Sequence, residues 1–496
     1  MEKFNELVGT IDGLVWGKPL ILIILLGGFW LTICLRCVQV RHLPLALKWM
    51  VRNEEEGKGE VSSFAALCTA LSATIGTGNI VGVATAIDTG GPGALFWMEI
   101  AAFLGMATKY TEGFLAVKYR EIDENGHALG GPFYYIEKGM GPKWKWLAKF
   151  FALFGAIAGA FGIGTITQVN GIATAVEGFF DPNQAHTVNM GVFGTHTWAI
   201  IIASLVVAIL AGLVLIGGIK RIGNVATIIV PFMIILYAVS VLILLVFNAN
   251  KIPEAIVLIV KGAFNPQAVG GGLLGSFMIA VQAGVARGIF SNEAGLGSAP
   301  IAAAAAQTNE PVRQGLVTMT GTFIDTIIVC TLTGLSVVIT GGWMQDGLEG
   351  GAITTYAFSN GLPFPNKVGA FILMICLSFF AFTTILGWDY YSERCVEYLT
   401  RGSRKAVKAY RWIYILAVFI GPYLTVSAVW NIADIFNGLM AFPNMIALFA
   451  LSGVAAKETR DFFKSGRAKE MIEADDRAFA ELKAEKAAEK AAKKAK

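Results

Sequence analysis

The chain has few of the residues on which enzymes and metal proteins depend. Only four histidines and six cysteines occur among its 496 residues, and no GxxxxGK[ST] phosphate loop is present. The histidines all fall in predicted loops or at the edges of apolar runs: His42, His127, His186 and His196. These absences exclude an ATP-driven pump and leave a membrane enzyme without a convergent acid–base or metal set. We therefore expect no enzymatic activity, no cofactor and no nucleic-acid partner.

Charge is also scarce. Asp, Glu, Lys and Arg make up 15% of the chain, hydrophobic residues make up 55%, and the mean hydropathy is +0.62. Apolar runs of about 20 residues, the length that crosses a bilayer core of about 30 Å, recur throughout. This pattern predicts an all-α, polytopic membrane protein with about eleven transmembrane helices in a lipid bilayer.

Basic residues are missing from alternate loops. The loops near 180–196 and 341–366 contain no Lys or Arg, whereas the basic loops lie near 36–60, 118–145, 218–221 and 394–411. The chain is expected in the cell membrane, that is, the plasma or inner membrane. The positive-inside rule then places the N-terminus on the outer side of this membrane and the C-terminus in the cytoplasm. An odd number of crossings requires the same arrangement. The tail 457–496 predicts a charged cytoplasmic helix, either solvated or in contact with anionic headgroups.

Two membrane-length segments contain interruptions. The run LSATIGTGNIVGVATAI loses its helical character over residues 73–79. The run GGLLGSFMIAVQAGVARGIFSNEAGLGSAPIAAAAA, from 271 to 306, has a polar and glycine-rich centre: Gln282, Gly284, Gly288, Ser291, Asn292, Glu293 and Gly295. Each interior glycine costs about 1 kcal/mol of helix propensity. Hydrocarbon cannot hydrogen-bond the backbone groups that a break frees, so we expect both breaks to line a buried site.

The two interruptions divide the chain into similar halves. Each begins a block of five predicted spans, and the blocks enter the membrane from opposite sides. The predicted organisation is an extra N-terminal helix and basic loop (1–60), a first repeat (61–250), an inverted second repeat (265–456) and the tail. Broken helices in corresponding positions of inverted halves indicate the midplane site of a secondary transporter.

Several motifs then carry a family resemblance. GTGNIVGVATAI, GGPGALFWM, GGPFYYIEKGMG, VARGIFSNEAGLGSAP and TTILGWDYYSER, within about residues 10–455, resemble the alanine or glycine:cation symporter family. That family lies in the amino acid-polyamine-organocation superfamily, which shares the leucine-transporter fold. The resemblance implies a 5+5 inverted repeat and sodium-coupled uptake of alanine or glycine by alternating access. A proton-coupled amino-acid transporter, or a channel or sensor with the same fold, remains an alternative.

A small zwitterion needs partners for both of its charges and walls that set its size. The N–H groups of Thr77 and Gly78 are candidates for the carboxylate, because they begin a restarting helix. Gln168 is a candidate amide donor or, alternatively, a polar link between helices. The backbone near Val281 and Gln282 is expected to face the ammonium, with Val285 as a wall. Trp388 is expected to limit substrate size or, alternatively, to lie at the membrane interface.

The candidate sodium ligands follow from the resemblance. In this fold, carbonyl oxygens of a first broken helix and two adjacent hydroxyl side chains hold sodium, which implies Ser72, Ile75, Thr383 and Thr384 here. The alternative is that these threonines bond to their own helix. The wider fold implies a second, weaker position with Thr74 and Asn79. Asp325 is an acidic group well inside a predicted span, and we expect it to couple ion binding, to carry a proton or to pair with Arg287.

Overall fold

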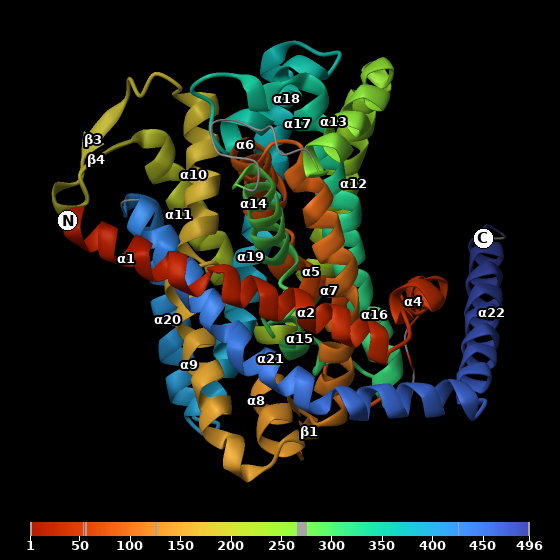
Figure 1. Cartoon of the computed structure of the whole chain (residues 1–496). Helices are drawn as coiled ribbons and strands as arrows, with labels where there is room; N and C mark the ends of the chain where they lie inside the picture. Colours follow the sequence, from red (N-terminus) through yellow and green to blue (C-terminus); the bar gives the residue numbers. More distant parts are fainter. Residues whose placement is uncertain are drawn as a thin grey trace.

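The computed structural model describes residues 2–52, 54, 57–124, 126–264, 275–424 and 426–494. Within these ranges the chain is mostly helical (Figure 1). The first residues of the second predicted interruption, 271–274, lie outside the described residues. The helices that precede the first interruption are α1 (Glu2–Val15), α2 (Lys18–Cys34), α3 (Val38–Arg41) and α4 (Leu43–Met50).

The remaining helices fall into the two predicted halves, the segment between them and the tail. The first half contains α5 (Ser63–Thr74), α6 (Val83–Gly90), α7 (Gly93–Lys118), α8 (Pro132–Tyr134), α9 (Lys145–Phe161), α10 (Ile166–Phe180), α11 (Trp198–Leu215) and α12 (Gly218–Phe247). Helix α13 (Ile252–Phe264) lies between the ranges predicted for the two halves. The second half contains α14 (Gly275–Asn292), α15 (Ala299–Ala303), α16 (Pro311–Thr322), α17 (Thr331–Thr340), α18 (Gly351–Gly361), α19 (Asn366–Leu399), α20 (Arg404–Ile420) and α21 (Val426–Lys464). The tail forms α22 (Arg467–Lys494).

Short elements complete the description. Wider, π-helical turns occur at Gly78–Gly82, Tyr135–Gly139 and Phe323–Cys330. Tighter 3₁₀ turns occur at Pro142–Trp144, Gly191–Phe193, Ala249–Lys251, Gly342–Met344 and Gly421–Tyr423. Two antiparallel strand pairs join helices: β1 (Glu121–Ile122) with β2 (Ala128–Leu129), and β3 (Thr187–Asn189) with β4 (Thr195–Thr197).

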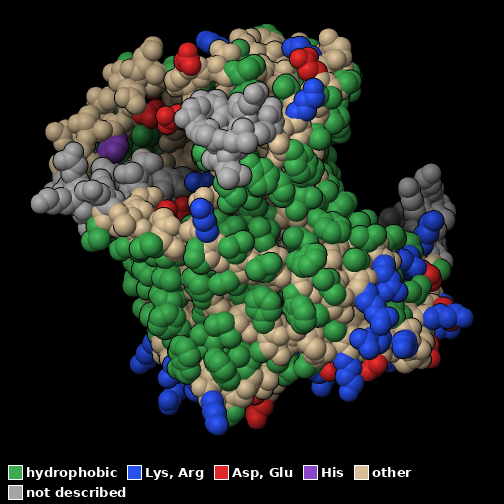
Figure 2. Space-filling model, viewed as in Figure 1, with side chains coloured by type: hydrophobic (Ala, Val, Ile, Leu, Met, Phe, Trp, Pro, Cys, Tyr) green, Lys and Arg blue, Asp and Glu red, His purple; other side chains and the backbone are tan. Residues whose placement is uncertain are grey.

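The helices have the length and surface of membrane spans. Among the described residues, seven helical stretches are long and apolar enough to cross a bilayer, or eight if α5 and the bent segment Gly78–Gly90 form one span. The outer faces of α11 and α12 expose side chains such as Ile202, Leu213 and Ile228. Hydrophobic side chains cover the middle of the face shown in Figure 2, with Lys and Arg gathered along its lower edge. Such an apolar surface is suited to contact with lipid. The expected total of about eleven membrane crossings remains a prediction.

The N-terminal helices pack against the end of the second half. In Figure 1, α1 and α2 cross the front of the molecule one after the other, close to α21. Trp16, in the turn between α1 and α2, donates its indole N–H to the carbonyl oxygen of Asp434 at 2.7 Å. The helix outside the two predicted repeats is therefore bonded to the second one.

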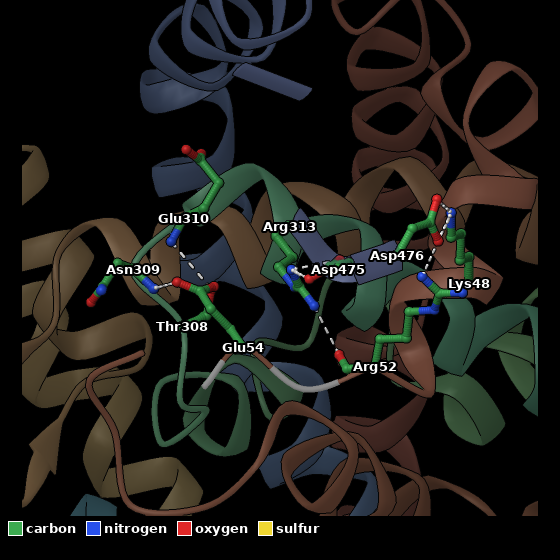
Figure 3. A network of polar contacts seen from close by, with 9 residues as sticks. All are labelled: Lys48, Arg52, Glu54, Thr308, Asn309, Glu310, Arg313, Asp475 and Asp476. Carbon is green, nitrogen blue, oxygen red and sulfur yellow. Dashed lines mark hydrogen bonds and ion pairs between the residues drawn. The ribbon is translucent and has the colours of Figure 1, made fainter. Parts of the chain in front are cut away.

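The first turns of the tail helix α22 form ion pairs with the rest of the protein, so this part of the tail is not surrounded only by solvent. Asp475 accepts two hydrogen bonds of 3.0 Å from Arg313 Nη1 on α16, and Asp476 pairs with Lys48 at 2.8 Å and with Arg52 (Figure 3). The side chain of Arg313 is fully buried, with its guanidinium 5.3 Å from the ring of Trp49. The tail thus links α4 to α16.

One break was not predicted. The sequence predicts a single helix over about 147–179, whereas α9 ends at Phe161 and α10 begins at Ile166. The carbonyl oxygen of Gly164, freed by this break, accepts a hydrogen bond of 2.8 Å from the hydroxyl of Tyr414 on α20. A Cβ atom on Gly164 would stand 2.5 Å from Cβ of Trp388 on α19. Glycine at this position lets the loop approach α19 closely.

Candidate functional site

The first break lies inside the predicted interval. Helix α5 ends at Thr74, and the chain bends by 53° before it continues through the π-helical turn to α6. The side chain of Asn79 closes the break, because its Oδ1 accepts the N–H of Gly76 at 2.9 Å. Ser72, Ile75, Thr77, Gly78 and Asn79 are all buried. The freed backbone groups are therefore enclosed in protein, as hydrocarbon requires.

Helix α19 crosses α5 at this break. A Cβ atom on Gly387 would stand 2.7 Å from the backbone nitrogen of Ala73, so glycine permits the close approach. The hydroxyl of Thr384 lies 3.3 Å from the carbonyl oxygen of Ile75 and 3.0 Å from that of Phe380. The crossing therefore brings together Thr384 and Ile75, two of the predicted sodium ligands.

The hydroxyls of the other predicted sodium ligands form hydrogen bonds within their own helices. Thr383 donates to the carbonyl oxygen of Phe380 at 3.0 Å and lies 3.4 Å from the sulfur of Met233 on α12. The hydroxyl of Ser72 donates to the carbonyl oxygen of Thr69 at 2.7 Å, and that of Thr74 to Ala70 at 3.2 Å. The intrahelical bonding considered from the sequence thus occurs in all three. Each hydroxyl uses its proton in that bond and keeps its oxygen lone pairs for a cation.

Gln168 on α10 reaches the first break. Its Oε1 accepts the N–H of Thr77 at 3.2 Å, and its Nε2 donates to the carbonyl oxygen of Ile163 in the unpredicted break at 3.0 Å. The hydroxyl of Thr77 is buried and has no hydrogen-bond partner among the described residues. Gln168 thus bridges two irregular segments and occupies the Thr77 N–H that was predicted to face a substrate carboxylate.

The second break begins near the end of the predicted polar centre, which runs from Gln282 to Gly295. Helix α14 is continuous to Asn292, and the chain is irregular over 293–298 before α15. Val281 and Gln282 therefore lie within α14, about three turns before the break, with Gln282 exposed. Val285 is 1% exposed. The expectation that freed backbone near Val281 and Gln282 faces an ammonium group does not match this helix.

The second break has its own polar supports. Glu293, at φ 56°, accepts the indole N–H of Trp388 at 2.8 Å and also bonds the hydroxyl of Ser298. Glu112 on α7 accepts Gly295 N–H at 3.1 Å and the amide of Asn444 at 2.7 Å. From the sequence, Glu112 is expected to pair with Lys109 and Glu293 lies in the polar centre of the second interruption, but their hydrogen bonds to this break were not predicted. Trp388 is fully buried, so its ring packs against protein.

Asp325 joins the two breaks. It lies in the π-helical turn between α16 and α17 and is fully buried. Its Oδ1 accepts the amide of Asn79 at 2.8 Å, and its Oδ2 accepts the hydroxyls of Ser291 at 2.9 Å and Thr326 at 2.7 Å. One carboxylate therefore bonds side chains from both interrupted segments.

The sequence offers two ion pairs, Lys109 with Glu112 at i,i+3 spacing and, as one alternative, Asp325 with Arg287. Lys109 and Glu112 lie 4.0 Å apart on α7, as their spacing predicts. Arg287 does not pair with Asp325, because its guanidinium lies 3.9 Å from Asp434 on α21 and over the ring of Phe290. Asp325 thus has neutral hydrogen-bond donors as its direct partners.

Sequence comparisons extend over nearly the whole chain. The profile of the sodium:alanine symporter family matches residues 1–476. The sodium/alanine symporter AgcS of Methanococcus maripaludis is 48% identical over 469 residues, which cover 92% of this chain and 97% of that protein. The putative sodium/proton-dependent alanine carrier protein YrbD of Bacillus subtilis is 39% identical over 472 residues, which cover 92% of each chain.

The fold has a match among solved structures. The crystal structure of MhsT in complex with L-phenylalanine aligns with a TM-score of 0.55 and 12% identity, covering 81% of this chain and 98% of that chain. At this identity the likeness shows the fold alone, and it confirms the leucine-transporter fold that the motifs imply. The match to a transporter family confirms that the protein is a transporter and not an enzyme. The chain belongs to the sodium:alanine symporter family.

Proposed function

We propose that the protein carries alanine or glycine into the cell together with sodium, by alternating access. The observation that carries this proposal is that the two interrupted segments meet in the interior through Asp325. The carbon Cδ1 of Phe290 and Cα of Ser291 would each lie 3.3 Å from a Cβ atom on Gly78. Family membership supplies the substrate class and the ion. The proposed moving parts are the two halves, 61–250 and 265–456, with the N-terminus outside and the tail in the cytoplasm.

The substrate site is proposed beside the first break. Thr77 and Gly78 supply N–H groups at the start of a helix, where partial positive charge favours a carboxylate. When substrate binds, its carboxylate replaces Gln168 Oε1 on the Thr77 N–H, and the buried Thr77 hydroxyl supplies a second donor. Val285 and Trp388, both buried, are the proposed walls that restrict the substrate to a small side chain.

The sodium site is proposed at the crossing of α5 and α19. A hard cation holds oxygen ligands at about 2.4 Å, so neighbouring ligands of an octahedral site lie about 3.4 Å apart. The 3.3 Å between Thr384 Oγ1 and the Ile75 carbonyl oxygen supports this placement. Ser72 and Thr383 complete the proposed set, and Thr74 and Asn79 form the weaker second position.

Proton coupling is a second candidate, and Asp325 is the observation that favours it. A buried carboxylate that bonds both breaks is placed to sense their movement, and the name of YrbD includes both sodium and proton dependence. In this version Asp325 carries the proton and sodium is not the driving ion.

Uptake of labelled L-alanine into proteoliposomes separates these candidates. We expect accumulation with an inward sodium gradient, none with a potassium gradient, and none with a proton gradient alone. Thr384→Ala is expected to raise the sodium concentration for half-maximal uptake at least tenfold. Thr355→Ala, which removes an exposed hydroxyl with a similar intrahelical bond, is the matched control. Accumulation driven equally well by protons would refute sodium as the driving ion.

A further inference from the structure

The segment before α5 and the segment after α15 pair with each other. The N–H of Val61 donates to the carbonyl oxygen of Ala305 at 3.2 Å, and the carbonyl oxygen of Val61 accepts the N–H of Gln307 at 2.7 Å. We call the paired residues, 58–61 and 304–308, the seam. Each side of the seam is continuous with one of the two interrupted segments, and the predicted topology places the seam on the cytoplasmic side.

Arg120, in the turn after α7, binds both sides of the seam. Its Nη1 donates to the carbonyl oxygens of Ala304 and Ala306, each at 2.6 Å, and its Nη2 donates to those of Lys58, at 2.7 Å, and Thr308. Hydrogen bonds from a charged donor are stronger than those between neutral groups. The seam therefore cannot open without moving one guanidinium away from carbonyl oxygens on both of its sides.

The tail helix α22 also reaches both sides of the seam (Figure 3). In the chain that leads to α5, Lys48 and Arg52 pair with Asp476. In the chain that follows α15, Arg313 at the start of α16 donates through Nη1 to both oxygens of Asp475. Nη2 of Arg313 donates to the carbonyl oxygen of Arg52 at 2.9 Å. Two adjacent carboxylates of one helix thus hold the chain on either side of the seam.

Further polar contacts join the same three parts. Glu54 Oε2 accepts the hydroxyl of Thr308 at 2.6 Å, and Glu54 Oε1 accepts the N–H of Asn309 at 3.1 Å. Near the start of α22, Nη1 of Arg467 lies 3.4 Å from Oε2 of Glu310. The tail, the chain before the seam and the chain after it therefore form one connected network.

We propose that the docked tail helix is a latch that holds the cytoplasmic face of the transporter closed. Alternating access requires the two sides of the seam to separate, so this inference rests on the proposed function. Separation must stretch the ion pairs that Asp475 and Asp476 form on the two sides. Arg313 is buried, whereas the pairs of Asp476 are partly exposed and therefore weaker, so Asp476 releases first. Release of the tail removes this resistance and speeds opening.

Ser63, the first residue of α5, provides a reporter of the opening. Its side chain is fully buried, and its hydroxyl has no hydrogen-bond partner in the part of the chain that the structure describes. Ser63→Cys therefore introduces a buried thiol with little disturbance. Cys34→Ala and Cys37→Ala remove the two native cysteines that are not buried, and the other four are buried. The full-length protein in lipid nanodiscs is treated with a water-soluble maleimide, and the same protein without Ser63→Cys gives the background rate.

Asp476→Lys is the variant that releases the latch, because it places a positive charge opposite Lys48 and Arg52. We expect the introduced thiol to react about fivefold faster or more, the scale expected when two partly exposed ion pairs become repulsive. Glu481→Lys, the matched control, makes the same change of charge at an exposed position later in α22 and should leave the rate unchanged. Adding Lys48→Glu and Arg52→Glu to Asp476→Lys restores both pairs with reversed signs and should restore the slow rate.

Three results would overturn the latch. The first is a thiol rate that Asp476→Lys leaves unchanged, and the second is a fast rate that persists when the reversed pairs are restored. The third is a fast rate accompanied by equally increased reaction of the four buried native cysteines, because that pattern reports loss of the fold instead of opening of the seam.

Uptake of labelled L-alanine into proteoliposomes separates this proposal from the proposed function. Sodium-driven uptake together with a thiol that does not respond to Asp476→Lys overturns the latch alone. A thiol that responds as expected, in a protein that accumulates no L-alanine under any ion gradient, overturns the proposed function and leaves the latch in place.

Discussion

Replacing Gly387 with alanine tests whether the crossing of α5 and α19 holds the sodium site. The added Cβ atom would stand 2.7 Å from the nitrogen and Cβ of Ala73 and 2.8 Å from its Cα. Ordinary contacts between such atoms begin near 3.4 Å. Because the opposing atoms belong to a backbone or its first side-chain carbon, a rotamer change cannot relieve the overlap. The two helices must separate by roughly 0.7 Å at this point.

The magnitude follows from two opposing effects. Overpacking of this kind costs about 1–3 kcal/mol, and exchanging a helical glycine for alanine returns about 1 kcal/mol. The net loss of stability is therefore about 0–2 kcal/mol. The same separation carries the Thr384 hydroxyl away from the Ile75 carbonyl oxygen, from 3.3 Å towards roughly 4 Å. Weakening one contact to a charged group costs about 1.5–3 kcal/mol, which corresponds to a roughly tenfold to hundredfold loss of sodium affinity.

The assay is the sodium dependence of L-alanine uptake in proteoliposomes, together with the unfolding temperature of the purified variant. Gly453→Ala on α21 is the matched control, because no atom lies within 4 Å of its added Cβ. That variant should keep its sodium dependence and unfold at the same temperature or higher. If Gly387→Ala shows the sodium half-saturation of the unmodified protein, the crossing does not set the sodium site.

Three further predictions use other parts of the molecule. In Asp325→Asn the amide cannot accept all the hydrogen bonds that the carboxylate now accepts, and each unsatisfied buried group costs about 1–3 kcal/mol. L-alanine uptake should fall at least tenfold in this variant, whereas Asp346→Asn, at an exposed position, should keep normal uptake. Normal uptake by Asp325→Asn would contradict a coupling role for Asp325. Asp475→Asn leaves the buried Arg313 guanidinium without its carboxylate and should lower the free energy of unfolding by about 3–5 kcal/mol. Asp476→Asn removes a charge from a partly exposed ion pair and should change the unfolding temperature little. Equal effects of the two substitutions would show that the burial of Arg313 does not matter for stability. Hydrogen bonds to Glu397 and Glu60 raise the pKa of His127 from 6.5 to about 9 against the opposing effects of burial and Arg394. The stability that charged His127 contributes is therefore complete below pH 6.5 and disappears as pH rises through about 9. Chemical unfolding of the unmodified protein and of His127→Gln should converge above pH 9, and a constant difference would refute the charged pairing.

The breaks and the family could be predicted because their signals are local. Gly76 and Gly78, with threonine and asparagine beside them in an apolar run, are incompatible with an undisturbed membrane helix. The position of the second break was harder to predict, because glycine has two uses in membrane helices. A Cβ atom on Gly284 would clash with the carbonyl oxygen of Ala94, and one on Gly288 would stand 3.0 Å from Met98. These glycines permit close packing of α14 against α7 and leave α14 helical.

The break between α9 and α10 could not be predicted from its own residues. Its freed carbonyl oxygens are bonded by Tyr414, which lies 250 residues away, and by Gln168. The roles of Glu112 and Glu293 also depend on distant partners, namely Asn444 and Trp388. Periodicity and composition report what one segment prefers, whereas these irregular segments are stabilised by side chains that only the tertiary structure brings near.

The hydrogen bonds of Asp325 restrict how the two interrupted segments can move. Displacement of the first segment by more than about 0.5 Å lengthens the 2.8 Å bond from Asn79 beyond ordinary hydrogen-bond distance, and the same holds for the 2.9 Å bond from Ser291. Neither segment can move alone without leaving part of a buried carboxylate unsatisfied, which costs several kcal/mol. The arrangement therefore favours states in which both breaks move together or in which a cation compensates the exposed charge. Since Asn79 also holds the Gly76 N–H beside Thr384, an ion bound at that crossing would change the position of the group that anchors Asp325. This shared anchor gives the proposed symport a physical route from sodium binding to the second half of the transporter.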